Sequence, residues 1–226
     1  QSLLDVLNYI NFSEETDLQK KYYEIKKFNP KLKSNWYDIA PYNIDVLQAI
    51  LTPELIKFIK FFFDTSTLFS GRAAIHVHDK DNDKLLMPHQ ETNQFAKDCL
   101  LLWVPLWNTN KDTGGITIFE KSHYKGYFDH QLEDPSGKKQ WTQKYTNIDE
   151  NIYKKFKRVN MEVKAGSAVL AHSSLVHCGY PLTKKETVRI TITERFNPLK
   201  KIPYLKDPSK PMKIPYVGTD VNIIEE

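Results

Sequence analysis

Cysteines and long apolar runs are the two features that this sequence most clearly lacks. Only two cysteines, Cys99 and Cys178, occur in 226 residues, and each lies within an apolar run typical of a strand. This low count argues against a disulfide-stapled scaffold and favours buried free thiols in a reducing cytoplasm. No run reaches the roughly 18 apolar residues of a membrane span, and no secretory signal pattern opens the chain. We therefore expect a cytoplasmic protein that does not bind membranes. Because Gln1 is not an initiator methionine, this expectation leaves open that residues were removed before it.

A strong excess of either charge is also lacking. The chain carries 32 lysine and arginine residues against 28 aspartate and glutamate residues, a formal net charge of +4, and its pI is about 8.8. The lysines are scattered through segments such as 20–33 and 200–213, which is typical of solvated faces. This pattern argues against a nucleic-acid partner and is compatible with a small anionic substrate. It gives no indication of the oligomeric state.

Length and apolar content predict one domain spanning residues 1–226. Hydrophobic residues make up 40% of the chain and aromatic residues 12%, enough for a core without disulfides or a structural metal. Residues 1–64 have helical spacing, and Thr52-Pro53-Glu54 predicts the start of a helix that runs to about Phe63. Residues 197–226 carry five of the twelve prolines, so they should form an extended tail.

Strand-like runs replace the helical spacing between about residues 70 and 196. These apolar or alternating runs are separated by turn residues and cover 73–78, 99–107, 115–119, 159–163, 167–172 and 188–195. Six strands without interleaved helices predict an antiparallel sandwich or barrel. Residues 121–158 are polar and too numerous for a plain turn, so we expect an insertion that covers the active site without joining the core.

The segment His89-Gln90-Glu91 is a candidate half of a metal site. Residues i and i+2 of an extended segment point the same way, so the imidazole and the carboxylate can bind one ion. His177, 88 residues later, adds a second imidazole. Two imidazoles and one carboxylate form the ligand set of non-haem ferrous oxygenases, which leaves positions for a cosubstrate and for oxygen. A His-x-Glu motif alone is weak evidence of a metal site. The evidence is stronger here because of the sequence segments that follow it.

Three segments follow His89 in a fixed order: Leu101–Trp107, Thr113–His123 and Gly166–His172. With the histidine motifs, they make the chain resemble the phytanoyl-CoA dioxygenase family over about residues 70–196. The resemblance implies a mainly β fold with N-terminal helices, whose core is a double-stranded β-helix, the jelly roll of cupin-like proteins. It also implies a dioxygenase that uses Fe(II), 2-oxoglutarate and O2 to hydroxylate a small molecule, with decarboxylation of 2-oxoglutarate to succinate.

The same resemblance assigns roles to individual residues. By position, His89, Glu91 and His177 correspond to the iron ligands and catalytic centre of the family. Arg189, twelve residues beyond His177, corresponds to the arginine that binds the distal carboxylate of 2-oxoglutarate, and Thr191 to a hydroxyl that assists it.

Two positions depart from the family pattern. The ligand carboxylate is Glu91 where the family usually has aspartate, and a Gly-Ser-His motif is replaced by Lys121-Ser122-His123. Glutamate is one methylene longer but keeps the charge and oxygen donor that a ferrous ion requires. Because halogenating relatives lack the carboxylate, Glu91 also argues against halogenation.

The case for Arg189 also rests on the chemistry of its side chain. Guanidinium is planar, permanently charged and fork-shaped, which suits two-pronged binding of a carboxylate. Residues 188–193 alternate, so Arg189, Thr191 and Thr193 share one strand face. A surface arginine on an edge strand is the alternative.

Other aromatic and histidine residues are weaker candidates. His76 and His78 share a strand face and are candidates for the wall of a substrate pocket, with structural histidines as the alternative. Trp103 and Trp107 alternate onto one face, where they either pack in the core or, as we suggest for Trp103, line the cosubstrate pocket. His172 is more typical of a packed or supporting histidine than of a ligand.

Two other classes of function compete with the oxygenase hypothesis. A cupin-like metalloenzyme that does not use 2-oxoglutarate would need only the three metal ligands. A jelly-roll binding module without catalysis would need neither the metal nor Arg189. Metal analysis distinguishes the last from the others, and succinate release distinguishes the first two. No motif identifies the primary substrate.

Overall fold

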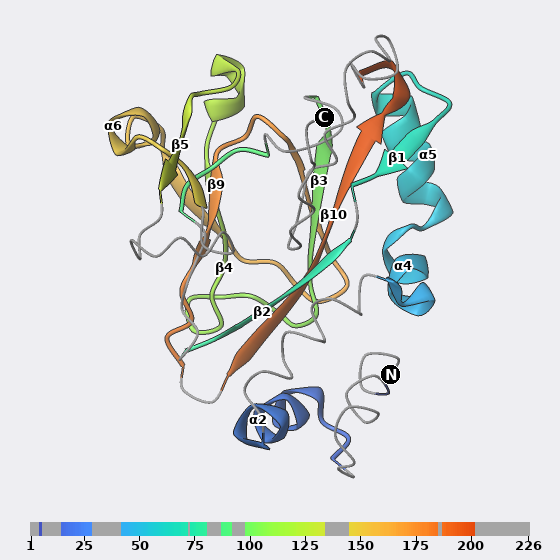
Figure 1. Cartoon of the computed structure of the whole chain (residues 1–226), viewed down its shortest axis with the longest axis vertical. Coiled ribbons are helices and arrows are strands. Elements are labelled where there is room, and N and C mark those ends of the chain that lie inside the picture. The colour runs from blue at the N-terminus through green and yellow to red at the C-terminus, as the bar shows by residue number, and fades with distance from the viewer. Residues whose placement is uncertain are drawn as a thin grey trace, which may run out of the picture.

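Antiparallel sheets with few helices make up the computed structural model of the chain (Figure 1). The structure describes the residues 5, 15–28, 42–71, 73–80, 87–91, 98–133, 145–184 and 187–201, except for the side chains of 131–133 and 145–147. Within these ranges, no helix is long and apolar enough to cross a membrane. Both cysteines are buried and free, which confirms the prediction from the sequence.

Among the described residues, three helices precede the sheets: α2 (Leu18–Phe28), α4 (Ile44–Ile50) and α5 (Pro53–Phe62). The start of α5 confirms the prediction, because the Thr52 side chain accepts a hydrogen bond from the Leu55 amide and Pro53 opens the first turn. Each helix contributes buried apolar side chains to the main hydrophobic cluster: Tyr22, Ile25, Val46, Ile50 and Ile59. The helices therefore cover the outer face of the larger sheet.

The long strand β10 (Val188–Pro198) organises the larger sheet. It pairs with β1 (Leu68–Ser70), β2 (Ala74–Asp79) and β3 (Leu100–Pro105), and β3 pairs with β8 (Val169–His172), all antiparallel. Its alternation divides the side chains as predicted. Val188, Ile190 and Ile192 pack in the main cluster with the helices, whereas the alternate residues line a cavity: Arg189, Thr191, Thr193 and Arg195.

A second sheet lies on the other side of that cavity. In it, β4 (Gly115–Phe119) pairs with β7 (Arg158–Met161) and with β9 (His177–Tyr180). Side chains from β2, β3 and β10 of the larger sheet and from β4 and β9 line the same cavity. The six predicted strands did not include β1 or β9, which are only three and four residues long, although the apolar run around Cys178 indicated a strand at β9.

The insertion is part of the fold wherever the structure describes it. Residues 121–158 form η2 (Ser122–Lys125), β5 (His130–Glu133), β6 (Tyr145–Ile148) and α6 (Glu150–Tyr153), and their last residue, Arg158, begins β7. Ile148 is buried in a cluster with Phe119 and Val176, and Phe128, Ile152, Tyr153 and Phe156 pack against it. The prediction that this stretch stays out of the core is wrong for these residues. It rested on the average composition of residues 121–158, which is polar and hides the few apolar side chains that are buried. Residues 134–144 lie outside the described part.

The predicted tail begins later than expected. Asn197 and Pro198 are the last residues of β10, where they pair with Phe69 and Leu68 of β1. Proline is tolerated there because it ends the strand. After η4 (Leu199–Lys201), the remainder of the tail, residues 202–226, lies outside the described residues.

Candidate active site

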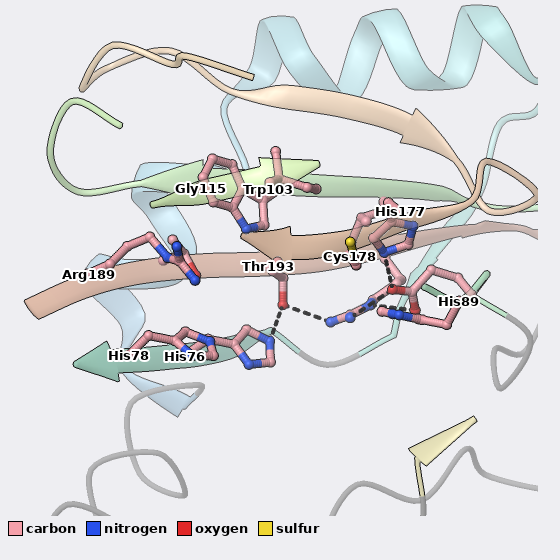
Figure 2. Close-up of a pocket in the computed structure, with 15 residues that line it drawn as sticks. His76, His78, His89, Trp103, Gly115, His177, Cys178, Arg189 and Thr193 are labelled. Carbon is pink, nitrogen blue, oxygen red and sulfur yellow. Dashed lines mark hydrogen bonds and ion pairs between the residues drawn. The ribbon is translucent and has the colours of Figure 1, made fainter. Parts of the chain in front are cut away.

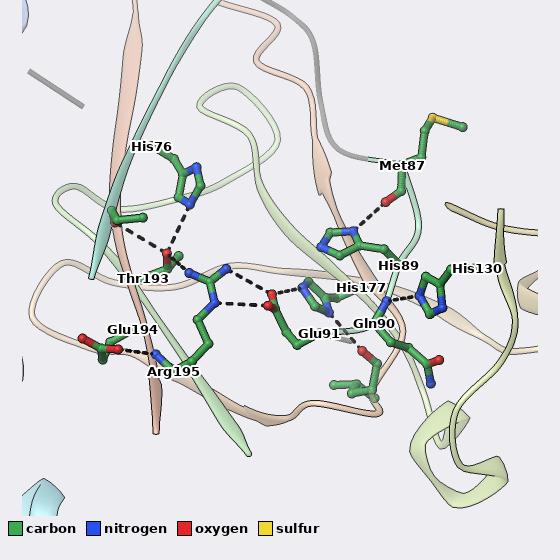
Figure 3. A network of polar contacts seen from close by, with 12 residues as sticks. His76, Met87, His89, Gln90, Glu91, His130, His177, Thr193, Glu194 and Arg195 are labelled. Carbon is green, nitrogen blue, oxygen red and sulfur yellow. Dashed lines mark hydrogen bonds and ion pairs between the residues drawn. The ribbon is translucent and has the colours of Figure 1, made fainter. Parts of the chain in front are cut away.

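His89 and His177 lie together at one end of the cavity (Figure 2), and Glu91 lies beside them (Figure 3). One ligand atom from each residue lies within 4.8 Å of the others, and among the residues described this is the only cluster of its kind. Nε2 of His177 is 3.5 Å from Oε1 of Glu91, and the two imidazole centroids are 4.4 Å apart. The three residues predicted from the sequence thus form one candidate metal centre.

Backbone hydrogen bonds join the two histidines directly. The amide of His89 donates to the carbonyl of His177, and the amide of His177 donates to the carbonyl of His89, each at 3.0 Å. This isolated antiparallel bridge brings together residues 88 positions apart in the chain. The relative position of the imidazoles therefore follows from the backbone.

A backbone carbonyl orients each imidazole. Nδ1 of His89 lies 2.7 Å from the Met87 oxygen, and Nδ1 of His177 lies 2.9 Å from the Leu175 oxygen. Because a carbonyl only accepts, Nδ1 carries the proton on both rings, which leaves each Nε2 with a lone pair. Histidine ligands of metals are typically held in this way.

Gln90 anchors the short segment between the first two ligands. Its side chain is 1% exposed and points away from the metal cluster, as expected between residues i and i+2. Its amide group donates to the carbonyls of Gly126 and Ser174 and accepts from the Phe128 amide. Its backbone N–H donates to Nε2 of His130 (Figure 3). The insertion thus holds the ligand segment in place.

Electrostatics favour a charged Glu91 carboxylate and a neutral His89 imidazole at this end of the cavity. Burial alone would raise the pKa of Glu91, but Arg195 and the neighbouring histidines hold it well below its usual range. Burial, followed by the proximity of His177, lowers the pKa of His89 to about 4. An anionic Glu91 and a neutral His89 are the protonation states that these two residues need as metal ligands.

Arg189 lies farther along the cavity (Figure 2), and Thr191 lines the cavity from the same face of β10. Arg189 is 5% exposed and its Nη1 donates to the Tyr180 carbonyl at 2.9 Å, so it is not a surface arginine. Gly114 makes room for it: a Cβ there would lie 2.5 Å from Nη1 of Arg189 and 2.6 Å from the Tyr180 oxygen. The Arg189 guanidinium therefore packs closely against Gly114, in the turn that precedes β4, where a larger residue would not fit.

The cavity between these two ends has a volume of about 60 Å³. Burial lowers the pKa of His76 to about 4 and that of His78 to about 3, so both are neutral at physiological pH. Fifteen residues line the cavity: His76, His78, His89, Glu91, Leu101, Trp103, Gly115, Ile116, His177, Cys178, Gly179, Arg189, Thr191, Thr193 and Arg195.

The structure separates the remaining candidates. Trp103 lines the cavity, but Trp107 lies beyond the end of β3 and packs against the main cluster, so the two do not share one face. His172 does not line the cavity, and its Nδ1 is 2.8 Å from the Ser174 hydroxyl. Ser122 is buried and accepts a hydrogen bond from the Val176 amide, which is a structural role.

Arg195 is a site residue that the sequence analysis missed. Its Nε and Nη2 donate to the two carboxylate oxygens of Glu91, each at 3.1 Å. The signal for it was present, because the alternation that places Thr191 and Thr193 beside Arg189 continues to Arg195. The predicted strand included this residue, but nothing in the sequence revealed its partner 104 positions earlier.

Solved structures show the same fold at low sequence identity. EvdO2 from Micromonospora carbonacea var. aurantiaca, complexed with 2-oxoglutarate, is 14% identical with a TM-score of 0.52, over 67% of this chain and 62% of that one. The epimerase SnoN, in complex with Fe3+, alpha ketoglutarate and nogalamycin RO, is 15% identical with a TM-score of 0.51, over 75% of this chain and 61% of that one. AviO1 from Streptomyces viridochromogenes Tue57 is 16% identical with a TM-score of 0.50, over 70% of this chain and 61% of that one.

The present chain is shorter than these similar structures. It spans 61% or 62% of the length of the three solved chains named above and 32% of the length of another solved chain that it matches, EvdMO1. A comparison with curated protein sequences finds no significant match.

A family model identifies the chain more directly. The model described as phytanoyl-CoA dioxygenase matches residues 44–189, which include all three candidate metal ligands and Arg189. The match covers more than half of the sequence and confirms the resemblance carried by the histidine motifs. The chain therefore belongs to the phytanoyl-CoA dioxygenase family.

Proposed function

We propose that the protein is an Fe(II)- and 2-oxoglutarate-dependent dioxygenase with a jelly-roll core, which hydroxylates a small-molecule metabolite and converts 2-oxoglutarate to succinate. One observation carries the proposal. A single cavity joins the cluster of His89, Glu91 and His177 to the buried arginine Arg189. A metal-binding protein without 2-oxoglutarate would not need the second feature.

The donor atoms fit a ferrous ion. Two imidazole Nε2 atoms and one carboxylate oxygen form the facial set typical of non-haem iron oxygenases, in which the other positions stay open. His89, Glu91 and His177 would hold the metal, which supplies activation of dioxygen and chelation of a 2-oxo acid. Both imidazoles already present the nitrogen that a metal binds.

Arg189 and Thr191 would bind the far end of 2-oxoglutarate. The guanidinium is buried and permanently charged, so a carboxylate in the cavity would make a strong charge-assisted hydrogen bond with it. Thr191 is 1% exposed and belongs to the same strand face. Together they would orient the cosubstrate along β10 toward the metal ligands.

Apolar side chains would keep water away from the reacting groups. Leu101, Trp103 and Ile116 line the cavity between its charged ends, and each is buried. Trp103 would thus form a wall of the cosubstrate pocket. An environment with little water strengthens the electrostatic interactions that hold a dianion.

His76 and His78 would contribute to the pocket of the primary substrate. They line the cavity on β2 as neutral imidazoles, which can both donate and accept hydrogen bonds. A small molecule with hydroxyl or carbonyl groups would suit them, and the nearby arginines would favour an anionic one.

The proposal predicts cosubstrate binding and turnover by the purified protein. Anaerobic addition of Fe(II) and then 2-oxoglutarate should produce a metal-to-cosubstrate charge-transfer band at one iron per chain. Exposure to oxygen should release succinate slowly, even without the primary substrate. If iron binds but neither the band nor succinate is detected, the protein is a metalloenzyme of another kind. If no metal binds, it is a binding module.

A substitution at Gly114 tests whether the packing of the Arg189 guanidinium against this glycine matters for cosubstrate binding. Gly114→Ala should weaken 2-oxoglutarate binding by about tenfold while iron stays bound, because the new Cβ would displace the guanidinium or the Tyr180 carbonyl. Gly166→Ala is the matched control, since Gly166 also has a positive φ, +80° against +66°, but nothing lies within 4 Å of its Cβ position. Equal 2-oxoglutarate affinity in both variants would show that the close packing of Arg189 against Gly114 is not needed for cosubstrate binding.

A further inference from the structure

The guanidinium of Arg195 donates two hydrogen bonds to the Glu91 carboxylate (Figure 3). Nε donates to Oε2 and Nη2 donates to Oε1, each at 3.1 Å, which is the paired geometry typical of arginine and carboxylate. Oε1 is also the oxygen that lies 3.5 Å from Nε2 of His177. The paired contact therefore determines which carboxylate oxygen faces the imidazoles.

The guanidinium is itself held by the larger sheet. Its remaining nitrogen, Nη1, donates to the hydroxyl of Thr193 at 2.8 Å, and this hydroxyl lies 3.1 Å from Nε2 of His76. Arg195 and Thr193 belong to β10, and His76 to the neighbouring strand β2. A continuous series of polar contacts thus links two paired strands to the carboxylate.

Glu91 needs such a restraint more than an aspartate would. Its side chain has one more rotatable bond, so an unrestrained carboxylate samples more orientations and loses more conformational entropy when fixed. Its own backbone is held by the amide, which donates to the Ser173 carbonyl at 2.9 Å. That bond fixes the main chain and leaves the side-chain torsions free.

We propose that Arg195 is the positioning residue of the metal centre, holding Glu91 so that Oε1 faces the metal position between His89 and His177. The role rests on the proposed metal site and requires no contact between Arg195 and the metal or the cosubstrate. It adds a residue six positions beyond residue 189, where the family match ends.

A lysine at position 195 separates positioning from charge. Arg195→Lys keeps the positive charge but cannot make the paired contact, so Co(II), used as a visible probe of the metal site, should bind about ten- to hundredfold more weakly to this variant. The absorption bands of bound Co(II) should also change, because the carboxylate is less constrained. Thr193→Val, which removes the Nη1 contact and keeps Arg195, should cause a smaller loss and provides a second variant if the first folds poorly.

Two comparisons make the effect specific. Arg189→Lys places the same substitution in the same cavity, away from Glu91, and should leave Co(II) affinity unchanged while weakening 2-oxoglutarate binding. In a Glu91→Asp background, the shorter side chain withdraws from the paired contact, so Arg195→Lys should have little further effect on Co(II) affinity.

The outcomes are distinguishable. An Arg195→Lys protein with wild-type Co(II) affinity and spectrum would overturn the role of Arg195 and leave the metal site intact. Tighter Co(II) binding would also overturn it, since the arginine would then oppose the metal. Failure of the wild-type protein to bind Co(II) or Fe(II) would overturn both the metal site and the inference built on it.

Discussion

Glu91→Ala should reduce iron affinity by at least a hundredfold and remove 2-oxoglutarate turnover. A ferrous ion at this position needs a hard anionic oxygen beside the two imidazoles, and Glu91 provides the carboxylate of the only such cluster among the described residues. The change also leaves the half-buried cation Arg195 without its carboxylate partner, which adds electrostatic repulsion toward a dication. Anaerobic iron titration and succinate assays measure the two effects.

Two variants serve as comparisons for Glu91→Ala. Glu91→Asp should keep the charge and retain measurable activity, with weaker iron binding because it withdraws from Arg195. Glu162→Ala removes an exposed acid outside the cavity and should change neither quantity. Undiminished iron affinity and turnover in Glu91→Ala would mean that another acid completes the site. Asp98 does not line the cavity and pairs with Lys201 at 3.1 Å. Asp83 lies outside the described residues.

Arg189→Leu should weaken 2-oxoglutarate binding by about ten- to hundredfold while iron stays bound. Charge-assisted hydrogen bonds contribute roughly 1.5 to 3 kcal/mol, which corresponds to that range of affinity. Leucine occupies a similar space along the strand face but offers no donor to a carboxylate. The measurement is an anaerobic titration of the iron-loaded protein with 2-oxoglutarate, followed through the charge-transfer band.

Arg158→Leu is the control for this experiment. Arg158 begins β7 and is exposed, so its removal changes the net charge equally without altering the cavity. Cosubstrate affinity should match the wild type in this variant. The assignment of Arg189 fails if its own leucine variant binds 2-oxoglutarate as well as the Arg158 variant does.

Local sequence patterns predicted much of the sheet that carries the site. The strict alternation of residues 188–193 predicted which side chains of β10 share a face, and the structure places one set against the helices and the other in the cavity. Thr52-Pro53 predicted the start of α5 because capping depends on neighbouring residues alone. The metal cluster was predicted through the family resemblance, because the His-x-Glu pair alone is a weak signal and the segments around it assigned His177 as the distant partner.

Other features depend on contacts between distant residues and escaped prediction. The pairing of Arg195 with Glu91 spans 104 positions, and no local pattern specifies it. Asn197 and Pro198 extend β10 because a short strand, β1, pairs with them, whereas their composition indicated a tail. We expected a polar insertion that covers the active site without joining the core. Ile148 instead packs with Phe119 and Val176, so part of the insertion belongs to a hydrophobic cluster formed by three separate segments.

The backbone bridge between His89 and His177 has a consequence for how the protein would acquire its metal. In small zinc domains, metal binding drives folding because the ligands converge only when the ion is present. Here, two main-chain hydrogen bonds make the ligands converge across 88 residues, so the chain entropy of bringing them together is lost during folding. Metal loading then becomes a local event on a folded scaffold. Chelation should empty the centre reversibly and leave the sheets in place.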